Sequence, residues 1–512
     1  MKLAPVGVLV LAACGAASSS SKAPQPASPA PAAAAGPRLR ERLKPCKLEG
    51  STEAALCGTY AVWENRTTQR GRKIELRIIA LPALGPDPAP DAIFWFAGGP
   101  GDTATGAAKY LATDSAQLRA RHDIVLIDQR GTGGSHPLNC KIPADPGNVQ
   151  AYFEPTLPVA EVKRCRAELE RDADLTQYTT SIAADDFDEV RAWLGYDRID
   201  LEGGSYGTRM AQVYLRRHGA HVRTATLTGV TAMNLYLPLY HARDGKQALD
   251  LTLDACVREV ACRVAFPTII DDHNRVMAAL ERAPGHAKVE SPVDHHPVEV
   301  TISRDIFAEQ IRFALYSAGS ASLVPYIVHR AAQGDFQPFA RLVMMWEPAL
   351  RRSLSYGEHL SVTCAEDVPF ITQDAIDHAI AGTYLRGFRV NQQVAACREW
   401  PRGEIPADFH APVTSDVPVL LISGNYDPVT PPSWAAQVAP HFKNALHVIV
   451  QNGHHGTGGL TNQECIRGIG AAFLESGSTA GLNASCVWLM YRPPFVLNDT
   501  TFDAQMTKLA GE

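Results

Sequence analysis

A serine flanked by glycines is the first pattern in this chain whose residue types could do chemistry. Gly203-Gly204-Ser205-Tyr206-Gly207 matches G-x-S-x-G. The outer glycines permit a sharp turn from a strand into a helix, and that turn exposes the serine hydroxyl. A serine hydroxyl becomes a good nucleophile when a histidine takes its proton and a carboxylate orients that histidine. We therefore expect Ser205 to be the nucleophile of a catalytic triad.

Candidates for the other two members follow downstream, in the order serine, acid, histidine that α/β-hydrolases use. Asp427 follows a strand-like segment, within Gly424-Asn425-Tyr426-Asp427-Pro428. His454 follows the next such segment, within Asn452-Gly453-His454-His455-Gly456. The adjacent His455 is an alternative. The residues alone leave both histidines as candidates for the base.

An acyl-transfer site also needs two backbone N–H groups to stabilise the oxyanion of the tetrahedral intermediate. Tyr206, directly after the nucleophile, is expected to supply one. Gly99 is expected to supply the other, because Gly98-Gly99-Pro100-Gly101 directly follows an early strand-like run.

Strand-like segments alternate with helical ones around these motifs. Strand-like segments lie at 73–81, 93–96, 124–127, 199–202, 225–230, 417–422 and 446–450, and helical patterns lie between several of them. This alternation predicts an α/β fold with a mostly parallel sheet and helices on both faces. Between about 232 and 400 the pattern is mainly helical. We therefore expect one α/β core at 38–231 and 401–512, interrupted by a helical cap at 232–400.

Three of these motifs together resemble a known family. Gly98 to Gly101, Asp128-Gln129-Arg130-Gly131-Thr132-Gly133-Gly134-Ser135 and the Ser205 motif are similar, in this order, to motifs of α/β-hydrolase fold aminopeptidases. These are proline iminopeptidase and its tripeptidyl aminopeptidase relatives. The resemblance favours His454 over His455 as the catalytic histidine, because this family places its histidine directly after the glycine. One departure is Ala97, where the family usually has a histidine. The resemblance spans roughly residues 45 to 480 and implies a serine exopeptidase that acts on short peptides. The Asp128 segment is expected to hold loops beside the site.

An aminopeptidase needs an anion for the substrate ammonium. Glu366 and Asp367, near the end of the expected cap, are the candidates, since the family tends to carry such acids in its cap. Two other functions fit the same residues. A carboxylic ester or other acyl compound could be the substrate, because the triad does not separate esters from peptides. A catalytically silent surface-binding protein is the third possibility.

The first residues predict export. Residues 1–14 combine Lys2, a short apolar stretch and small residues before Cys14, which is typical of a bacterial lipoprotein signal with its lipid-bearing cysteine. Residues 15–37 are mostly Ala, Pro and Ser, which predicts a flexible tether. We expect the protein to be lipid-anchored to a bacterial membrane, the outer membrane or periplasmic side if there are two.

Ten cysteines remain after Cys14, an even number that fits disulfides in an exported protein. Pairing each with its neighbour along the chain is one possibility among many, since connectivity does not follow from sequence. The chain has 48 Lys and Arg against 54 Asp and Glu, so its net charge of −6 disfavours nucleic-acid binding. It has no zinc or nucleotide motif of the H-E-x-x-H or G-x-x-x-x-G-K type, so we expect no metal or cofactor.

Overall fold

A nine-stranded sheet forms the centre of the computed structural model, which describes residues 39–142, 145 and 147–511. Its strands lie in the order β1 (Lys44–Lys47), β2 (Ala54–Trp63), β3 (Lys73–Leu81), β5 (Ile124–Ile127), β4 (Ala92–Phe96), β6 (Ile199–Gly204), β7 (Val222–Thr228), β10 (Val419–Gly424) and β11 (Ala445–Val450). From β5 to β11 all neighbours are parallel, and from β1 to β5 they are antiparallel. The predicted mostly parallel sheet is confirmed. The sequence analysis named neither β1 nor β2.

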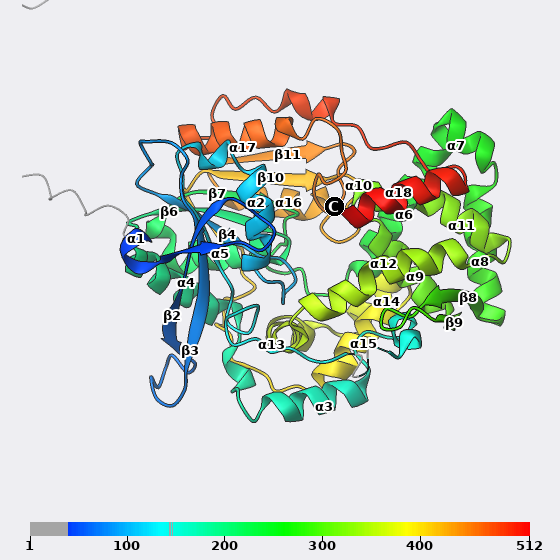
Figure 1. Cartoon of the computed structure of the whole chain (residues 1–512), viewed down its shortest axis with the longest axis horizontal. Coiled ribbons are helices and arrows are strands. Elements are labelled where there is room, and N and C mark those ends of the chain that lie inside the picture. The colour runs from blue at the N-terminus through cyan, green and yellow to red at the C-terminus, as the bar shows by residue number, and fades with distance from the viewer. Residues whose placement is uncertain (1–38, 143–144, 146, 512) are drawn as a thin grey trace, which may run out of the picture. The chain divides into compact units, whose positions relative to one another are not determined.

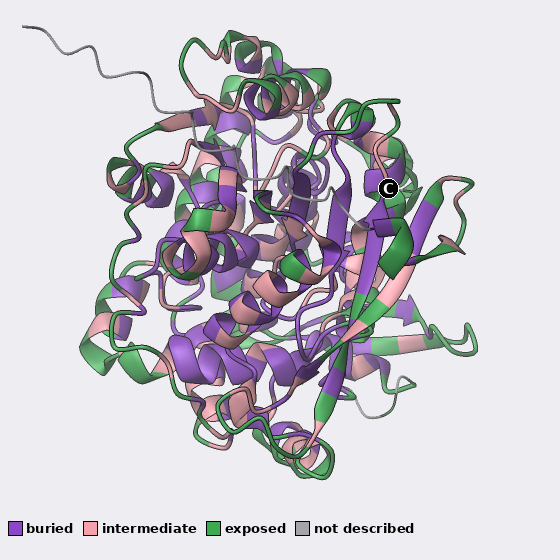
Figure 2. Cartoon of the chain, turned by 90° about the vertical axis from the view of Figure 1, so that its left-hand side faces the viewer, coloured by how far each residue is buried: buried purple, intermediate pink, exposed green. Residues whose placement is uncertain are grey.

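Helices cover both faces of this sheet. One face packs on α4 (Thr180–Leu194), α5 (Tyr206–His218) and α16 (Pro432–Val438). The other packs on α2 (Ala108–Asp114) and α17 (Glu464–Ser476). The central strands are buried on both faces and therefore read as continuous apolar runs, while exposed residues gather on loops and outer helix faces (Figure 2).

The chain between β7 and β10 forms an insertion with its own apolar core. Its elements are α6 (His241–Arg258), α7 (Val260–Ala265), α8 (Ile269–Arg282), β8 (Gly285–Glu290), β9 (Pro297–Ile302), α9 (Arg304–Ala314), α10 (Ala318–Ala321), α11 (Val324–Ala332), α12 (Gln337–Ser353), α13 (Tyr356–Glu366), α14 (Gln373–Ile380) and α15 (Phe388–Cys397). The antiparallel β8–β9 hairpin is an addition to the helices expected in this mainly helical cap.

The C-terminal segment joins this second core. Helix α18 (Asp499–Gly511) lies beside the insertion in Figure 1, and its Phe502 packs with Phe495 into the insertion's apolar cluster. The last helix of the 401–512 segment, which was expected to belong to the core, thus packs on the insertion. Helices α1 (Leu39–Arg42) and α3 (Val159–Leu169) complete the described α-helices.

Five disulfides join cysteines that are neighbours in the cysteine order: Cys46–Cys57, Cys140–Cys165, Cys256–Cys262, Cys364–Cys397 and Cys465–Cys486. The neighbour pairing is confirmed. Cys14, the expected signal and the expected tether lie outside the described residues. No helix in the described part of the chain is both long and apolar enough to cross a membrane.

Candidate active site

Ser205 lies on a strained turn between β6 and α5, with φ +55° and ψ −123°. Two neighbouring glycines make that turn possible. A Cβ atom on Gly207 would lie 2.2 Å from the Phe96 carbonyl oxygen, and one on Gly203 would lie 2.4 Å from the Gly207 carbonyl oxygen. No side chain fits at either position. The G-x-S-x-G pattern therefore reflects close backbone packing, which holds the serine at the end of the sheet.

Asp427 and His455 form a hydrogen-bonded pair beside this turn. His455 Nδ1 lies 2.9 Å from Oδ2 of Asp427. The Asp427 carboxylate also accepts hydrogen bonds from Val429 N and from Thr430 N and Oγ1, at 2.7–2.8 Å. Burial raises the pKa of Asp427, but the His455 charge and these hydrogen bonds outweigh burial and hold it below its ordinary value. Asp427 is therefore held as a carboxylate that orients His455.

His454 occupies a different position from the one expected. Its Nδ1 lies 2.7 Å from the Leu315 carbonyl oxygen at the end of α9, and its ring stacks on Tyr426. Only 3% of its surface is exposed, and burial lowers its pKa to about 4. The expectation that His454 pairs with the acid is wrong, because Leu315 from the insertion holds its imidazole away from Asp427. The sequence shows two adjacent histidines and carries no signal of this distant contact.

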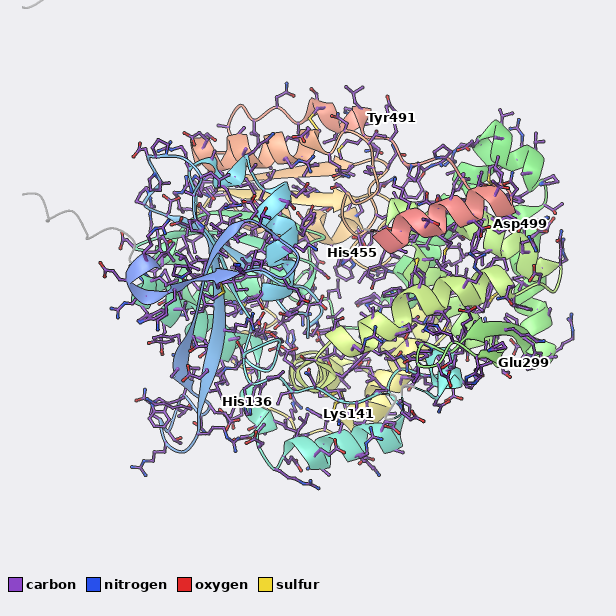
Figure 3. The ribbon with its side chains drawn as sticks, in the orientation of Figure 1. His136, Lys141, Glu299, His455, Tyr491 and Asp499 are labelled. Atoms are coloured by element: carbon purple, nitrogen blue, oxygen red, sulfur yellow. A yellow bond between two sulfur atoms is a disulfide. The ribbon has the colours of Figure 1, made fainter. Side chains whose placement is uncertain are left out.

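Ser205 and His455 line one cavity of about 360 Å³. The sheet side contributes both these residues with the 98–100 loop, and the insertion contributes side chains from α6, α9, α12, α13 and α15. Figure 3 shows His455 between the ends of β10 and β11 and the insertion helices. Among the described residues, no hydrogen bond joins Ser205 Oγ to His455. Such contacts often tighten only when substrate binds.

The two expected oxyanion donors lie in this cavity wall. Tyr206 is the first residue of α5, so its N–H has no acceptor four residues earlier within the helix. Gly99 has φ +106°, and a Cβ there would lie 2.6 Å from Gly101 N. The loop is held from behind by Asp128, which accepts hydrogen bonds from Thr103 and Thr105 at 2.6–2.8 Å. The Asp128 segment thus holds a loop beside the site, as expected.

Glu366 and Asp367 do not reach the cavity. Asp367 forms a fully buried ion pair with Arg209, at 2.9 Å. Glu366 accepts hydrogen bonds of 2.7 Å from both N and Oγ1 of Thr180. Thr180 Oγ1 in turn lies 2.6 Å from the Tyr206 hydroxyl. The structure therefore corrects the expected ammonium site: these acids support the backbone turn after Ser205 and are not available to a substrate.

A different acid, Asp102, faces the nucleophile. A Cβ built on Gly98 would lie 3.4 Å from both an Asp102 carboxylate oxygen and Ser205 Cβ, so the two side chains are close neighbours. Asp102 lines the cavity, and in the described chain it has no hydrogen-bond or ion-pair partner. Burial raises the pKa of Asp102, and the charge of His455 offsets only part of this rise. The sequence analysis missed Asp102 although it directly follows Gly101, because no local pattern shows that its side chain turns toward Ser205.

Two clusters outside the cavity have ligand types and spacings that could hold a cation: Asp188 with His218 and His221, and Asp91 with His122 and Asp200. Arginines already pair with their carboxylates. Arg191 contacts Asp188 at 2.7 Å, and Arg223 contacts Asp200 at 2.7 Å. We therefore interpret both clusters as structural ion-pair networks.

Parts of this chain match known protein families. Residues 93–265 match the alpha/beta hydrolase fold family, and residues 383–486 match the family described as TAP-like protein. Serine protease Hip1 of Mycobacterium tuberculosis is 23% identical over 464 residues, which cover 84% of this chain and 87% of that protein. Tripeptidyl aminopeptidase of Streptomyces coelicolor is 28% identical over 189 residues, which cover 34% of this chain and 35% of that protein.

Among solved structures, proline iminopeptidase of Mycobacterium smegmatis is 15% identical with a TM-score of 0.37, covering 82% of this chain and 98% of that one. The sheet order and the turn at Ser205 agree with the family match at residues 93–265. The chain therefore has the α/β-hydrolase fold of a serine hydrolase, with a TAP-like region at residues 383–486.

Proposed function

We propose that this chain is a serine exopeptidase that cleaves short peptides near their free N-terminus. The observation that carries the proposal is the unpaired Asp102 carboxylate beside Ser205, inside a cavity roofed by the insertion. A roofed cavity favours chain ends over the middle of a folded protein. The names of the relatives, a serine protease and a tripeptidyl aminopeptidase, support the peptidase part of the proposal.

In the proposed reaction Ser205 Oγ attacks the scissile carbonyl carbon while His455 Nε2 takes the hydroxyl proton. Asp427 holds the resulting imidazolium through Nδ1. The oxyanion accepts hydrogen bonds from the N–H groups of Gly99 and Tyr206. His455 then returns the proton to the leaving amine as the C–N bond breaks. A water molecule, deprotonated by His455, then attacks the acyl-enzyme. The bond between Ser205 Oγ and the acyl carbon breaks, His455 returns the proton to Ser205, and the N-terminal fragment leaves.

Asp102 is assigned to the substrate ammonium because the other acids of the cavity are already occupied. Arg312 binds Glu309 through two hydrogen bonds, at 2.6 and 3.2 Å. Glu347 accepts hydrogen bonds from Gln310 at 2.6 Å and from Arg351 at 2.7 Å. Of the described carboxylates lining the cavity, only Asp102 is free to pair with a cation.

The test compares Asp102→Asn with the wild type on matched fluorogenic peptide amides that carry a free or an acetylated N-terminus. We expect kcat/KM for the free-amine substrates to fall by about 10- to 100-fold, the size of a charged hydrogen bond, with little change for the acetylated ones. Glu366→Gln is the control variant and should leave the ratio between the two substrate series unchanged. Ser205→Ala should abolish both activities.

Two outcomes would overturn the exopeptidase proposal. Equal turnover of free and acetylated peptides would remove the role of the N-terminus. Hydrolysis of a short-chain nitrophenyl ester without cleavage of any peptide would leave an acyl-ester hydrolase on the same residues. A folded protein whose Ser205 fails to react with a fluorophosphonate would instead fit a silent binding protein. A series from single amino-acid amides to tripeptide amides gives the number of residues released.

We also propose that the enzyme works outside the cytoplasm, anchored by lipid on Cys14. The five disulfides support export, because such bonds persist in oxidising compartments. Incorporation of an alkyne-labelled fatty acid in a bacterial host should depend on Cys14. Equal labelling of Cys14→Ser would contradict the anchor and leave the catalytic proposal untouched.

A further inference from the structure

A second unpaired charge lines the catalytic cavity, and it is positive. Arg389 on α15 is partly exposed and belongs to the cavity wall. Its Nη1 donates a 2.9 Å hydrogen bond to Oε1 of Gln393, which is a neutral partner. In the described part of the chain no carboxylate lies within ion-pairing distance of this guanidinium. A guanidinium remains charged at physiological pH, so this wall carries a cation without an ion-pair partner among the described residues, although Glu309 is near enough to act on it electrostatically.

The other charges near Arg389 are already balanced. Arg312 and Glu309 neutralise each other in a two-point contact on α9. Glu347 on α12 is neutralised by Arg351. Burial, with the positive charges of the neighbouring arginines, lowers the pKa of both His241 and His359, and that of His359 falls to about 4. These histidines therefore add no charge near neutral pH. Among the described residues, Arg389 accounts for the net positive charge of this part of the cavity.

Arg389 is also held in place from behind. Gln393 is fully buried, and its Nε2 donates to Thr363 Oγ1 at 2.8 Å. The ring nitrogens of His359 lie 3.3 Å from Gln393 Oε1 and 3.2 Å from the Pro100 carbonyl oxygen. The guanidinium is therefore linked through two side chains to the loop that carries Gly99. A fixed arginine with free N–H groups is suited to the planar, two-oxygen geometry of a carboxylate.

We propose that Arg389 forms a subsite for a substrate carboxylate, so that the enzyme prefers short peptides with an anionic group. This inference rests on the proposed function and specifies its substrates. The carboxylate has two possible sources, an Asp or Glu side chain or the free C-terminus of a very short peptide. Together with Asp102, Arg389 gives the cavity one negative and one positive anchor, which match the two charges of such a peptide.

The test measures how well peptides protect Ser205 from a fluorophosphonate probe, so it does not depend on peptide cleavage. One arm compares Ala-Ala-Glu amide with Ala-Ala-Gln amide, and the other compares Ala-Ala-Ala with its C-terminal amide. We expect the carboxylate form to protect at about 10- to 100-fold lower concentration in at least one arm. The arm that shows the difference identifies the source of the carboxylate.

Variants then assign the effect to Arg389. Arg389→Gln should abolish the difference, whereas Arg389→Lys should keep part of it. For each variant, protection is expressed relative to that variant's own labelling rate without peptide. The matched control is Arg386→Gln. Arg386 lies three residues earlier, is exposed and pairs with Glu281 at 3.0 Å, outside this cavity. It should behave as the wild type.

Equal protection by the charged and neutral peptides, or no protection by any peptide, would overturn the proposal. So would a difference that survives in Arg389→Gln. Failure of the exopeptidase proposal would appear separately, as a protein that binds these peptides at Ser205 but does not cleave them or does not require their free amine.

Discussion

His455 Nδ1 lies 2.9 Å from Asp427 Oδ2, while Nδ1 of the adjacent His454 lies 2.7 Å from the Leu315 carbonyl oxygen. Two neighbouring residues of the same type thus serve two different parts of the molecule. One histidine faces the cavity with Ser205, and the other fixes the end of α9, and with it the insertion, to the loop after β11. The geometry gives the two histidines separable roles.

Replacing each histidine should therefore have opposite consequences. His455→Ala should lower kcat by at least about 1,000-fold with little change in unfolding free energy, because the nucleophile loses its base. His454→Ala should lower the unfolding free energy by about 1–3 kcal/mol through the lost buried hydrogen bond and packing, and should retain most of kcat. Denaturant unfolding and initial rates on one peptide amide measure both quantities. If His454→Ala is the inactive variant, the assignment is wrong.

The turn at Ser205 should tolerate an alanine in place of Gly204 but not in place of Gly207. A Cβ on Gly207 would lie 2.2 Å from the Phe96 carbonyl oxygen, whereas one on Gly204 would meet no atom within 4 Å. Gly207→Ala should lower the unfolding free energy by about 1–3 kcal/mol or more, because backbone atoms must move. It should also slow fluorophosphonate labelling of Ser205. Gly204→Ala is the matched control and should stay close to wild type in both measurements.

The buried Glu366 should make stability depend on pH. Burial raises the pKa of Glu366 to about 7, and the Arg209 charge and the Thr180 hydrogen bonds oppose that rise only in part. The folded protein thus holds this proton more tightly than the unfolded chain. The stabilisation is complete below the unfolded pKa of 4.5 and is lost as the pH rises toward about 7.

Glu366→Gln should therefore flatten the decrease of unfolding free energy between about pH 5 and pH 7. Denaturant unfolding of the wild type and the variant across this range measures the difference between the two slopes. The control is Glu49→Gln at an exposed position, which should keep the wild-type slope. Parallel curves for wild type and Glu366→Gln would contradict the expected proton linkage.

Short sequence patterns predicted the strands and turns whose conformation depends on residues close together in the chain. The apolar runs of β4, β5 and β6, followed by glycine-containing turns, placed the sheet and Ser205. Asp427 followed from its place after β10. The partner of each histidine could not be predicted in this way, because Leu315 is 139 residues from His454 in the chain. Glu366 was expected to bind the substrate ammonium, since nothing in its sequence neighbourhood shows that Thr180 will bind its carboxylate.

The Cys364–Cys397 disulfide ties α13 to α15 and so bears on the carboxylate subsite. Arg389 and Gln393 lie on α15, and the side chains that hold Gln393 lie on α13. Replacing both cysteines by serine opens a loop with a sequence separation of 33 and should lower the unfolding free energy by about 3–4 kcal/mol. It should also reduce the preference for carboxylate-bearing peptides, because Arg389 loses its fixed position.

Removing Cys46–Cys57 is the control for that experiment. This bond joins β1 to β2 at the far edge of the sheet, away from the cavity. Its loss should lower stability but leave the ratio of protection by carboxylate and amide peptides at the wild-type value. If both disulfide variants lose the preference equally, the effect comes from general loosening of the fold. If neither loses it, α15 holds Arg389 without the covalent link, through the Gln393 hydrogen bonds alone.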